Sequence, residues 1–371
     1  MLEHGGRLHA ASLRYGIPRQ DWLDLSTGIN PAVYPLPTIP PEAWQRLPEG
    51  DDGLEAAARA AYGADPAAAV LALPGSQAAI QALPALRPAS SVAVLAPTYA
   101  EHPYAWETRT GHGSSHRLAT FAADGLLEAA ARHDVVVLGN PNNPDGTRFS
   151  RAALLDAARL LQARGGWLVV DEAFADADSL AGGAGAADAT DDGSVAPFAG
   201  SPAYPGLIVL RSLGKFYGLA GARVGFVLLA PALAARLAEA LGPWPVAGPS
   251  RWAARAALAD GAWQRRAAAD LGRAAARLAN LLAPLGPVAG CALFQTLTLG
   301  PEQAAALYDH LARRGLLARL FAPQGRVRFG LPSATSANSG DSGDSGNPAD
   351  LPHSAAWQRL ARALDDFKAL R

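Results

Sequence analysis

The sequence lacks most features of membrane, secreted, metal-binding and nucleic-acid-binding proteins. Its one cysteine, Cys291, leaves no intrachain disulfide, and no cluster of cysteine and histidine indicates a zinc site. No apolar run reaches the roughly 20 residues of a membrane-spanning helix, and the start resembles no signal peptide. With 32 basic and 33 acidic residues, the chain has no excess of cations for nucleic-acid phosphates. We therefore expect a cytoplasmic protein that has no metal and binds neither membranes nor nucleic acids.

Lysine is also scarce. Of the 32 basic residues, only Lys215 and Lys368 are lysines. A GC-rich genome, which favours arginine codons, is the simplest explanation. Whatever the cause, chemistry that needs a side-chain amine has only two candidate positions.

The order of the apolar segments indicates two domains. Between residues 50 and 230, short apolar strands alternate with helical stretches, a pattern typical of a parallel sheet covered on both faces. The expected strands are Ser91–Ala96, Asp134–Leu138, Trp167–Val170, Leu207–Leu210 and Arg223–Leu229. Further on, the sequence predicts one long helix over Arg251–Leu285 and then a mixture of strands and helices. We expect an N-terminal arm (1–45), a large domain (46–230) and a small α+β domain (231–371).

Two stretches look inserted, residues 180–201 and 333–350. Both are rich in small and polar residues and have too little apolar content to offset the entropy of ordering. We expect flexible surface loops there.

The segment 212–225 places Lys215 in a small-residue turn directly after an apolar strand. Burial or a neighbouring cation can make such an amine nucleophilic, as Schiff-base chemistry needs. Ser212 and Arg223 could bind a phosphate dianion through a hydroxyl and a guanidinium group. A lysine in a turn is usually just solvated, but these neighbours and the scarcity of lysine favour a functional role.

Three further segments carry polar groups at the ends of expected strands or at the start of a helix. Asp171 directly follows an apolar strand, where a carboxylate could keep a pyridine nitrogen protonated; a helix N-cap or a solvated carboxylate is the open alternative. The run 139–146, rich in Asn and Pro, is a rigid double turn that could fix an asparagine side chain.

Gly75, Ser76 and Gln77 open a helix whose N–H groups could bind an anion, although many helix starts look similar.

Together and in this order, these segments resemble the fold type I pyridoxal 5′-phosphate (PLP) enzymes, the aspartate-aminotransferase-like superfamily. The resemblance covers nearly the whole chain apart from the two inserts, and its most specific part is Ser-x-x-Lys with an arginine eight residues later. It implies an α/β protein of the PLP-dependent transferase fold type I. In that fold a large domain has a mostly parallel seven-stranded sheet between helices, and a smaller α+β domain follows. The resemblance also implies a homodimer.

The resemblance gives roles to individual residues. It implies that Lys215 bonds covalently to PLP and that Asp171 pairs with the pyridine nitrogen. The other cofactor contacts that it implies are Asn143 at the phenolic oxygen, Tyr99 on the ring, Gly75, Ser76, Gln77, Ser212 and Arg223 around the phosphate, and Tyr62 reaching the phosphate of the neighbouring subunit. For the substrate it implies Arg328 at the α-carboxylate, and Arg319 and His4 together with Asn30 at a distal phosphate.

The N-terminus narrows the choice within the superfamily. His4-Gly5-Gly6 and the segment 23–31 resemble the cobalamin-biosynthesis branch, which includes L-threonine-O-3-phosphate decarboxylases. Phe174, where histidinol-phosphate aminotransferases carry tyrosine, fits the same branch. The resemblance thus implies a PLP-dependent carbon–carbon lyase that converts L-threonine O-3-phosphate to (R)-1-amino-2-propanol O-2-phosphate in adenosylcobalamin biosynthesis. Two alternatives stay open: a histidinol-phosphate-type aminotransferase and a non-decarboxylating PLP-fold subunit of cobalamin assembly.

Overall fold

The chain divides into two compact units. The computed structural model describes residues 4–110, 113, 115–181, 193–333 and 354–370. Unit 1 combines Met1–Val33 with Arg266–Arg371, and unit 2 is Tyr34–Arg265.

The boundary between the units differs from the expected one. We expected the small domain to begin at residue 231, but α10 (Pro231–Leu241) and α11 (Gly248–Ala259) belong to unit 2. They do so because they pack on α4 (Ser76–Ala82) and α3 (Leu54–Tyr62) respectively. At the N-terminal end, the arm that joins unit 1 ends at residue 33 rather than 45.

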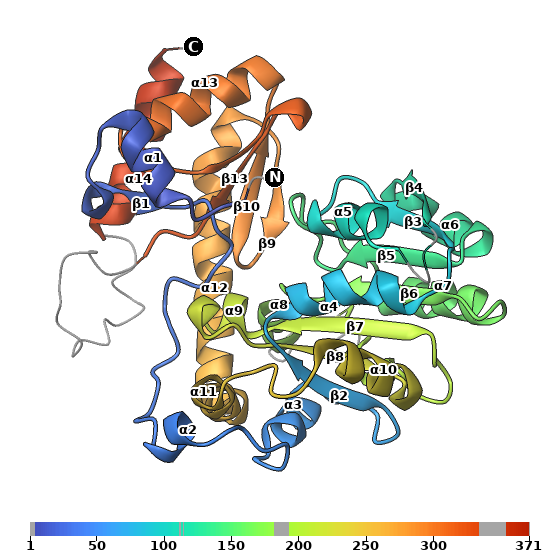
Figure 1. Ribbon diagram of the computed structural model, residues 1–371. Helices are drawn as coiled ribbons and strands as arrows, with labels where there is room; N and C mark the ends of the chain where they lie inside the picture. The colour runs from blue at the N-terminus through green and yellow to red at the C-terminus, as the bar shows by residue number, and fades with distance from the viewer. Residues whose placement is uncertain (1–3, 111–112, 114, 182–192, 334–353, 371) are drawn as a thin grey trace. The chain divides into compact units, whose positions relative to one another are not determined.

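Unit 2 is built on a seven-stranded sheet, as the resemblance implied (Figure 1). Its strands are β2 (Ala69–Leu73), β3 (Ser91–Leu95), β4 (Arg117–Phe121), β5 (Val135–Gly139), β6 (Trp167–Asp171), β7 (Leu207–Ser212) and β8 (Gly225–Leu229). They are hydrogen-bonded in the order β2-β8-β7-β6-β5-β3-β4, and only the two pairings of β8 are antiparallel. The prediction of a mostly parallel α/β sheet is therefore confirmed.

Helices cover both faces of this sheet, which explains its continuous apolar strands. Residues 135–138 of β5 are four fully buried apolar residues in a row, as expected of a strand with helices on both sides. On one face, alternate strand residues pack with α4, α5 (Glu101–Thr108) and α10 in one core cluster. The remaining helices of unit 2 are α2 (Glu42–Gln45), α6 (Leu126–Arg132), α7 (Arg151–Gln162), α8 (Asp176–Ala181) and α9 (Leu213–Phe216).

Unit 1 is a smaller α+β structure. Its helices are α1 (Leu8–Tyr15), α12 (Gly261–Leu282, which starts at the end of unit 2), α13 (Pro301–Ala312) and α14 (Ala355–Ala369). An antiparallel sheet has the order β12 (Arg319–Phe321), β13 (Arg326–Gly330), β10 (Phe294–Thr298) and β9 (Val288–Cys291). A short parallel pair joins β1 (Leu23–Asp24) to β11 (Leu316–Leu317).

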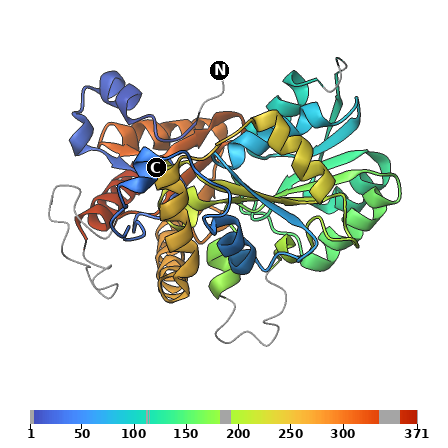
Figure 2. The same ribbon diagram turned by 60° about the horizontal axis from the view of Figure 1, so that its bottom comes forward.

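The single helix expected over Arg251–Leu285 is in fact two helices. The chain turns at Asp260, between α11 and α12, the long light-orange helix of Figures 1 and 2. The Asp260 carboxylate accepts a hydrogen bond from the Trp263 N–H (2.9 Å) and thereby caps α12. The prediction was wrong because the periodicity of the apolar residues continues across this cap.

The two inserts have different outcomes. Residues 182–192 and 334–350 lie outside the described residues. Residues 193–201, expected to be part of a flexible surface loop, are instead packed into unit 2, where Ser194, Val195 and Ala196 are buried. No helix in the described part of the chain is long and apolar enough to cross a membrane.

Candidate active site

The candidate cofactor residues of unit 2 meet at one edge of the sheet. The carboxyl ends of the parallel strands and the start of antiparallel β8 lie at that edge, because Asp171 pairs with Gly139 and Leu210, and Ser212 pairs with Gly225. The predicted contacts found there are Gly75, Ser76 and Gln77 after β2, Tyr99 after β3, Asn143 after β5, Asp171 at the end of β6, Ser212 and Lys215 at the end of β7, and Arg223 before β8. Ligands of open α/β sheets bind at this edge.

Asp171 is held by two hydrogen bonds. Its Oδ2 lies 3.0 Å from Nε2 of His102, and its Oδ1 accepts the Ala173 N–H at 3.0 Å. The His102 side chain is 2% exposed and that of Asp171 is 11% exposed. Asp171 is therefore fixed in orientation but still accessible, as a partner of a pyridine nitrogen must be.

His102 is a functional candidate that the sequence analysis missed. It lies in the first turn of α5, three residues after Tyr99, and the two rings meet edge to face at 6.0 Å. Tyr99 precedes the helix, and a turn in which the His102 N–H donates to the Tyr99 carbonyl (3.0 Å) brings the two residues together. That spacing was the only available signal, and it shows nothing of the contact with Asp171.

Gln77 has its side chain engaged within the protein. Its Nε2 donates to Oε2 of Glu101 (2.8 Å), and its Oε1 accepts from the half-buried hydroxyl of Tyr99 (3.3 Å). The backbone N–H of Gln77 is thus the group suited to a phosphate, and the side chain instead fixes the position of Tyr99.

The predicted phosphate site is a cradle with no room for side chains. A Cβ on Gly75 would lie 2.6 Å from Nη2 of Arg223, and a Cβ on Gly225 would lie 2.3 Å from the backbone nitrogen of Ser76. Gly75 has φ +79° and Arg223 has φ 54°, so both backbones adopt the left-handed region. The guanidinium group of Arg223 therefore lies directly against the first turn of α4, an arrangement that fits the phosphate of PLP.

Lys215 lies in the short helix α9, immediately after β7. Its Nζ is 5.5 Å from the ring centre of Phe174, which follows Asp171 by three residues and is buried. The other lysine, Lys368, lies in α14 of unit 1 and pairs with Asp365. Lys215 is therefore the one amine side chain at this edge.

The two asparagines of the turn in residues 139–146 have different roles: Asn142 is structural, and Asn143 is a candidate cofactor contact. Asn142 is fully buried, donates to the Pro97 carbonyl (2.8 Å) and to Asp145 (2.7 Å), and accepts from Thr98 (3.0 Å). These bonds hold the turn. Asn143, the predicted contact of the phenolic oxygen, is the partly exposed residue of the pair.

In unit 1, two predicted substrate residues are direct cross-strand partners. Arg319 of β12 lies opposite Arg328 of β13, and both guanidinium groups lie near the ring of Phe321, at 5.4 and 5.9 Å. Arg328 is buried and donates to the Ser26 carbonyl (2.9 Å). Like charges directly opposite each other destabilise a sheet, so this pair suits a position where anions bind.

The structure also brings His4 together with Arg319. Both line a cavity of about 510 Å³ in unit 1. Arg328 and Asn30 are not among the residues lining it; Asn30 is buried and accepts the Ala32 N–H (2.9 Å). Of the three residues expected at a distal phosphate, the cavity thus joins His4 and Arg319 but not Asn30.

Comparison with known proteins assigns the chain to a family. Residues 47–339 match the model of the aminotransferase class I and II family. The chain belongs to this family. It is 48% identical over 370 residues to the threonine-phosphate decarboxylase of Pseudomonas aeruginosa, covering 99% of this chain and 98% of the relative. It is 38% identical over 334 residues to the threonine-phosphate decarboxylase of a Sinorhizobium species, covering 86% and 90%.

A solved structure confirms the fold. The histidinol-phosphate aminotransferase of Sinorhizobium meliloti in complex with pyridoxal-5′-phosphate superposes with a TM-score of 0.76 at 22% identity, covering 100% of this chain and 96% of that one. At this identity, the similarity supports the fold and not the reaction.

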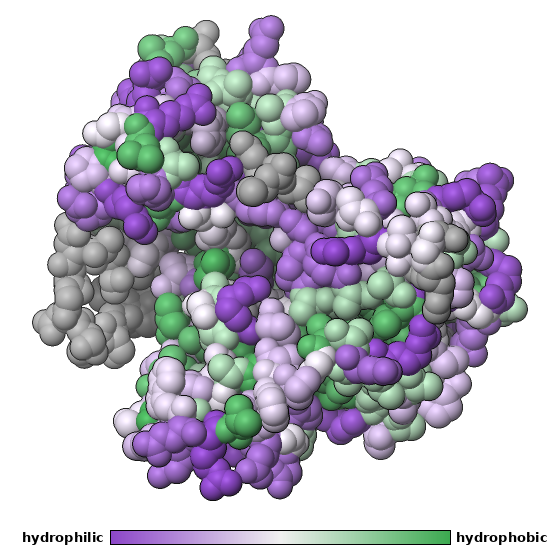
Figure 3. Space-filling view, in the orientation of Figure 1, coloured by the Kyte–Doolittle hydropathy of each residue, from purple (hydrophilic) through white to green (hydrophobic). Residues whose placement is uncertain are grey.

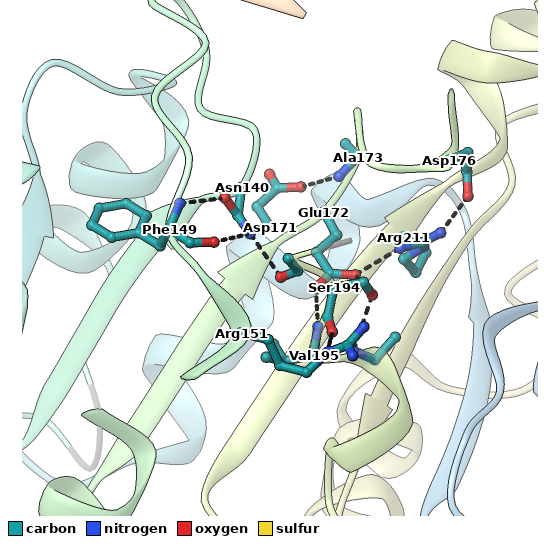
Figure 4. A network of polar contacts seen from close by, with 12 residues as sticks. Asn140, Phe149, Arg151, Asp171, Glu172, Ala173, Asp176, Ser194, Val195 and Arg211 are labelled. Carbon is teal, nitrogen blue, oxygen red and sulfur yellow. Dashed lines mark hydrogen bonds and ion pairs between the residues drawn. The ribbon is translucent and has the colours of Figure 1, made fainter. Parts of the chain in front are cut away.

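Behind the site, this class I and II chain carries a buried network of charges that the sequence analysis also missed (Figure 4). Arg211 donates to Glu172 (2.6 Å) and to Asp176, and all three side chains are at most 5% exposed. The Glu172 carboxylate also accepts from the Ser194 hydroxyl and the Val195 N–H, both at 2.7 Å. The network ties the end of β6 to the end of β7 and to the packed segment 193–195.

The pKa values of this network are set by burial and by mutual attraction. Burial raises the pKa of the Glu172 and Asp176 carboxyl groups, although the Arg211 guanidinium opposes this. Burial alone would lower the pKa of Arg211, but the two carboxylates raise it above its ordinary value. Each of the three ions therefore depends on the others for its charge.

Tyr62 does not meet the expectation from the resemblance. We expected it to reach the cofactor phosphate of a neighbouring subunit, but its ring packs edge to face on Phe226 (5.8 Å) and lies 4.4 Å from the Arg211 guanidinium. It is 6% exposed and its hydroxyl is enclosed by the protein. The reason is that α3, which ends at Tyr62, packs on β2 and turns this residue into the core.

Proposed function

We propose that this chain is a PLP-dependent threonine-phosphate decarboxylase. It removes CO₂ from L-threonine O-3-phosphate and forms (R)-1-amino-2-propanol O-2-phosphate for adenosylcobalamin biosynthesis. The identity of 48% over nearly the full length of the Pseudomonas aeruginosa relative supports this activity. The structural observation that carries the proposal is the cross-strand pair of Arg319 and Arg328.

This pair favours a substrate with two anionic groups. Phosphothreonine carries a phosphate and an α-carboxylate, whereas histidinol phosphate carries a phosphate and no carboxylate. In our proposal Arg328 binds the carboxylate and Arg319, with His4, binds the phosphate. A guanidinium group can bind either anion through two parallel hydrogen bonds.

The residues of unit 2 have separate tasks in holding the cofactor. When bound, PLP supplies an electron sink for the electron pair that remains on Cα after CO₂ leaves. Arg223, Ser212 and the N–H groups at the start of α4 hold its phosphate. Asp171 keeps the proton on the pyridine nitrogen, and His102 fixes the orientation of Asp171.

The substrate-binding residues select which bond breaks. Bound PLP would favour cleavage of the Cα bond whose orbital overlaps its π system. Binding the substrate by its carboxylate and its phosphate fixes the torsion about this bond, and orientation of this kind can lower the activation free energy by several kcal/mol. Lys215 then donates a proton to Cα as a general acid, at the position that CO₂ has left.

One assay tests the proposal. Purified protein reconstituted with PLP is incubated with O-phospho-L-threonine in the absence of 2-oxoglutarate, and released CO₂ and the amine product are measured. We expect CO₂ and aminopropanol phosphate in equal amounts. If instead no CO₂ forms and histidinol phosphate with 2-oxoglutarate yields glutamate, the chain is an aminotransferase; if neither reaction occurs, it is a non-decarboxylating subunit.

The proposal includes a homodimer in the cytoplasm. Support for an interface comes from Leu36, Trp44 and Leu47, whose large apolar side chains are exposed close together in the sequence. The single buried cysteine, which leaves no intrachain disulfide, suits a reducing compartment. Sedimentation of the wild type and of W44E tests the dimer: we expect the variant to sediment as a monomer.

A further inference from the structure

The cavity of unit 1 has an unusual balance of charge. Its lining includes His4 and three arginines, namely Arg7, Arg14 and Arg319. Among the described residues that line it there is no aspartate or glutamate. Over the whole chain, acidic residues slightly outnumber basic ones, so this concentration of cations is local and creates a positive potential that attracts anions.

The N-cap residue and the last turn of α1 supply half of these cations, Arg7 and Arg14. Ala10, Ala11 and Arg14 lie on one side of this helix, and Arg7 directly precedes it, its carbonyl accepting the Ala11 N–H (3.1 Å). All four line the cavity. The two alanines leave space between the arginines, and Ala11 packs in a buried cluster with Trp22 and fixes this face toward the cavity.

The His-Gly-Gly motif is held at the cavity by a close approach of two backbones. A Cβ on Gly5 would lie 2.3 Å from the Ser26 carbonyl oxygen, so no larger residue fits there. The Gly6 N–H donates to the Ser26 hydroxyl (2.7 Å), and Gly6 has φ +79°. His4 is thereby placed in the cavity wall beside Ser26, which also lines it.

The outer part of this site is open to solvent. His4, Arg7 and Arg14 are exposed, whereas Arg319 is partly buried. Hydrophilic side chains predominate on the surface where α1 lies (Figure 3). Cations at such an entrance raise the local concentration of an anionic ligand and its rate of association.

We propose that Arg7 and Arg14 complete a phosphate-monoester site together with His4 and Arg319, of which Arg319 is the innermost member. The ligand class is an O-phosphorylated amino acid, and for this identity the inference rests on the proposed function. A phosphate dianion has three terminal oxygens and can accept hydrogen bonds from several guanidinium groups at once. Arg7 and Arg14 thus select phosphorylated substrates over their unphosphorylated counterparts.

The test uses the holoenzyme, in which PLP fills its own phosphate site, and inorganic phosphate as the probe. Binding of phosphate is measured by calorimetry for the wild type, R7Q, R14Q and R7Q/R14Q, at low and at high salt. We expect the double variant to bind phosphate about three- to tenfold more weakly, because each group is exposed and contributes modestly, and to lose most of the salt dependence. R19Q, which changes an exposed arginine of the same arm outside the cavity, is the matched control and retains wild-type binding.

Kinetics with O-phospho-L-threonine give a second readout. We expect R7Q/R14Q to raise KM by about the same factor by which it weakens phosphate binding, at unchanged kcat. R7K/R14K retains both charges and should therefore have a KM close to that of the wild type. Wild-type phosphate binding in R7Q/R14Q, or no phosphate binding by the wild type, overturns the inference. If phosphate binds as described but O-phospho-L-threonine releases no CO₂, the proposed function fails and the anion site stands.

Discussion

The imidazole of His102 and the carboxylate of Asp171 form a 3.0 Å contact between two chain segments 69 residues apart. His102 is almost fully buried, so the contact is shielded from water and is stronger than the same pair on the surface. With a proton on Nε2, the ring donates a hydrogen bond to the Asp171 carboxylate. Asp171 thus remains oriented toward its proposed partner, the cofactor nitrogen.

Replacement of His102 removes this orienting bond. We expect H102A to lower kcat for O-phospho-L-threonine about 10- to 100-fold, since a hydrogen bond to a charged group contributes about 1.5–3 kcal/mol. The absorbance of the bound cofactor, followed against pH, should shift as well. H116A is the control: His116 is a buried histidine of the same unit that binds the Pro84 carbonyl, so its loss affects stability alone. Unchanged kcat and spectrum in H102A would show that Asp171 needs no such support.

The scarcity of lysine makes the covalent attachment easy to test. We expect borohydride reduction of the holoenzyme to fix the cofactor on Lys215 and nowhere else, as peptide mass mapping would show. K215A should lose the label and at least about a hundredfold in rate, the usual contribution of a general acid. K368A removes the other lysine, which pairs with Asp365 on α14, and should behave as the wild type. A label on Lys368, or none, would refute the assigned role.

The sequence predicted strand positions well where a strand is apolar on both faces. The central strands β3, β5, β6 and β7 lie within one or two residues of their expected positions, because continuous apolar runs are typical of parallel strands. The edge strands β2 and β4 were missed. β2 is rich in alanine, which favours helices, and β4 is an edge strand of mixed polarity.

Within the site, local motifs were found and long-range contacts were not. Lys215, Asp171 and Arg223 could be named from short patterns, and the structure places them at one sheet edge. The network of Arg211, Glu172 and Ser194 could not, because the register of β6 and β7 and the packing of residues 193–195 create it. The spacing of residues along the chain does not predict contacts of this kind.

The buried network gives a prediction about stability. E172Q removes one charge and leaves Arg211 with an incomplete set of partners in a dry environment. We expect the free energy of unfolding to fall by about 3–5 kcal/mol, as measured for broken buried ion pairs. Urea unfolding followed by circular dichroism measures the change. E49Q is the control, because the ion pair of Arg46 and Glu49 is exposed, with side chains 74% and 65% accessible to solvent. We expect E49Q to leave the free energy of unfolding unchanged. Equal stability of the two variants would contradict the assigned importance of Glu172.

The glycine cradle predicts a defect in cofactor binding. A Cβ at Gly225 would lie 2.3 Å from the Ser76 nitrogen, and a contact with backbone cannot be relieved by rotating a side chain. We expect G225A to displace the start of α4 and to weaken PLP binding at least about tenfold, measured by equilibrium dialysis. G221A is the matched control in the same segment, because a Cβ there meets no atom within 4 Å. Equal affinity of both variants for PLP would show that the cradle does not hold the phosphate.

The last prediction concerns acid stability, which depends on Asp52 where α3 meets α11. Its carboxylate accepts two hydrogen bonds from Arg251, at 2.6 and 2.7 Å. Burial alone would raise the pKa of Asp52, but the bonds from Arg251 and the Leu54 N–H lower it below its ordinary value. Because the folded-state pKa is the lower one, this stabilisation is fully present above the unfolded value of about 3.9 and is lost as the pH falls through the folded pKa.

We therefore expect D52N to lower the free energy of unfolding by about 1 kcal/mol at neutral pH, less than for a buried pair because a third of the Asp52 side chain is exposed. The difference from the wild type should shrink as the pH falls below about 4, since the protonated wild-type carboxyl no longer gains from Arg251. Urea titrations at a series of pH values measure both effects. D51N, which changes the exposed neighbouring residue, is the control, and its free energy of unfolding should equal that of the wild type at every pH. A D52N curve parallel to that of the wild type down to pH of about 3 would mean that Arg251 does not lower the pKa of Asp52.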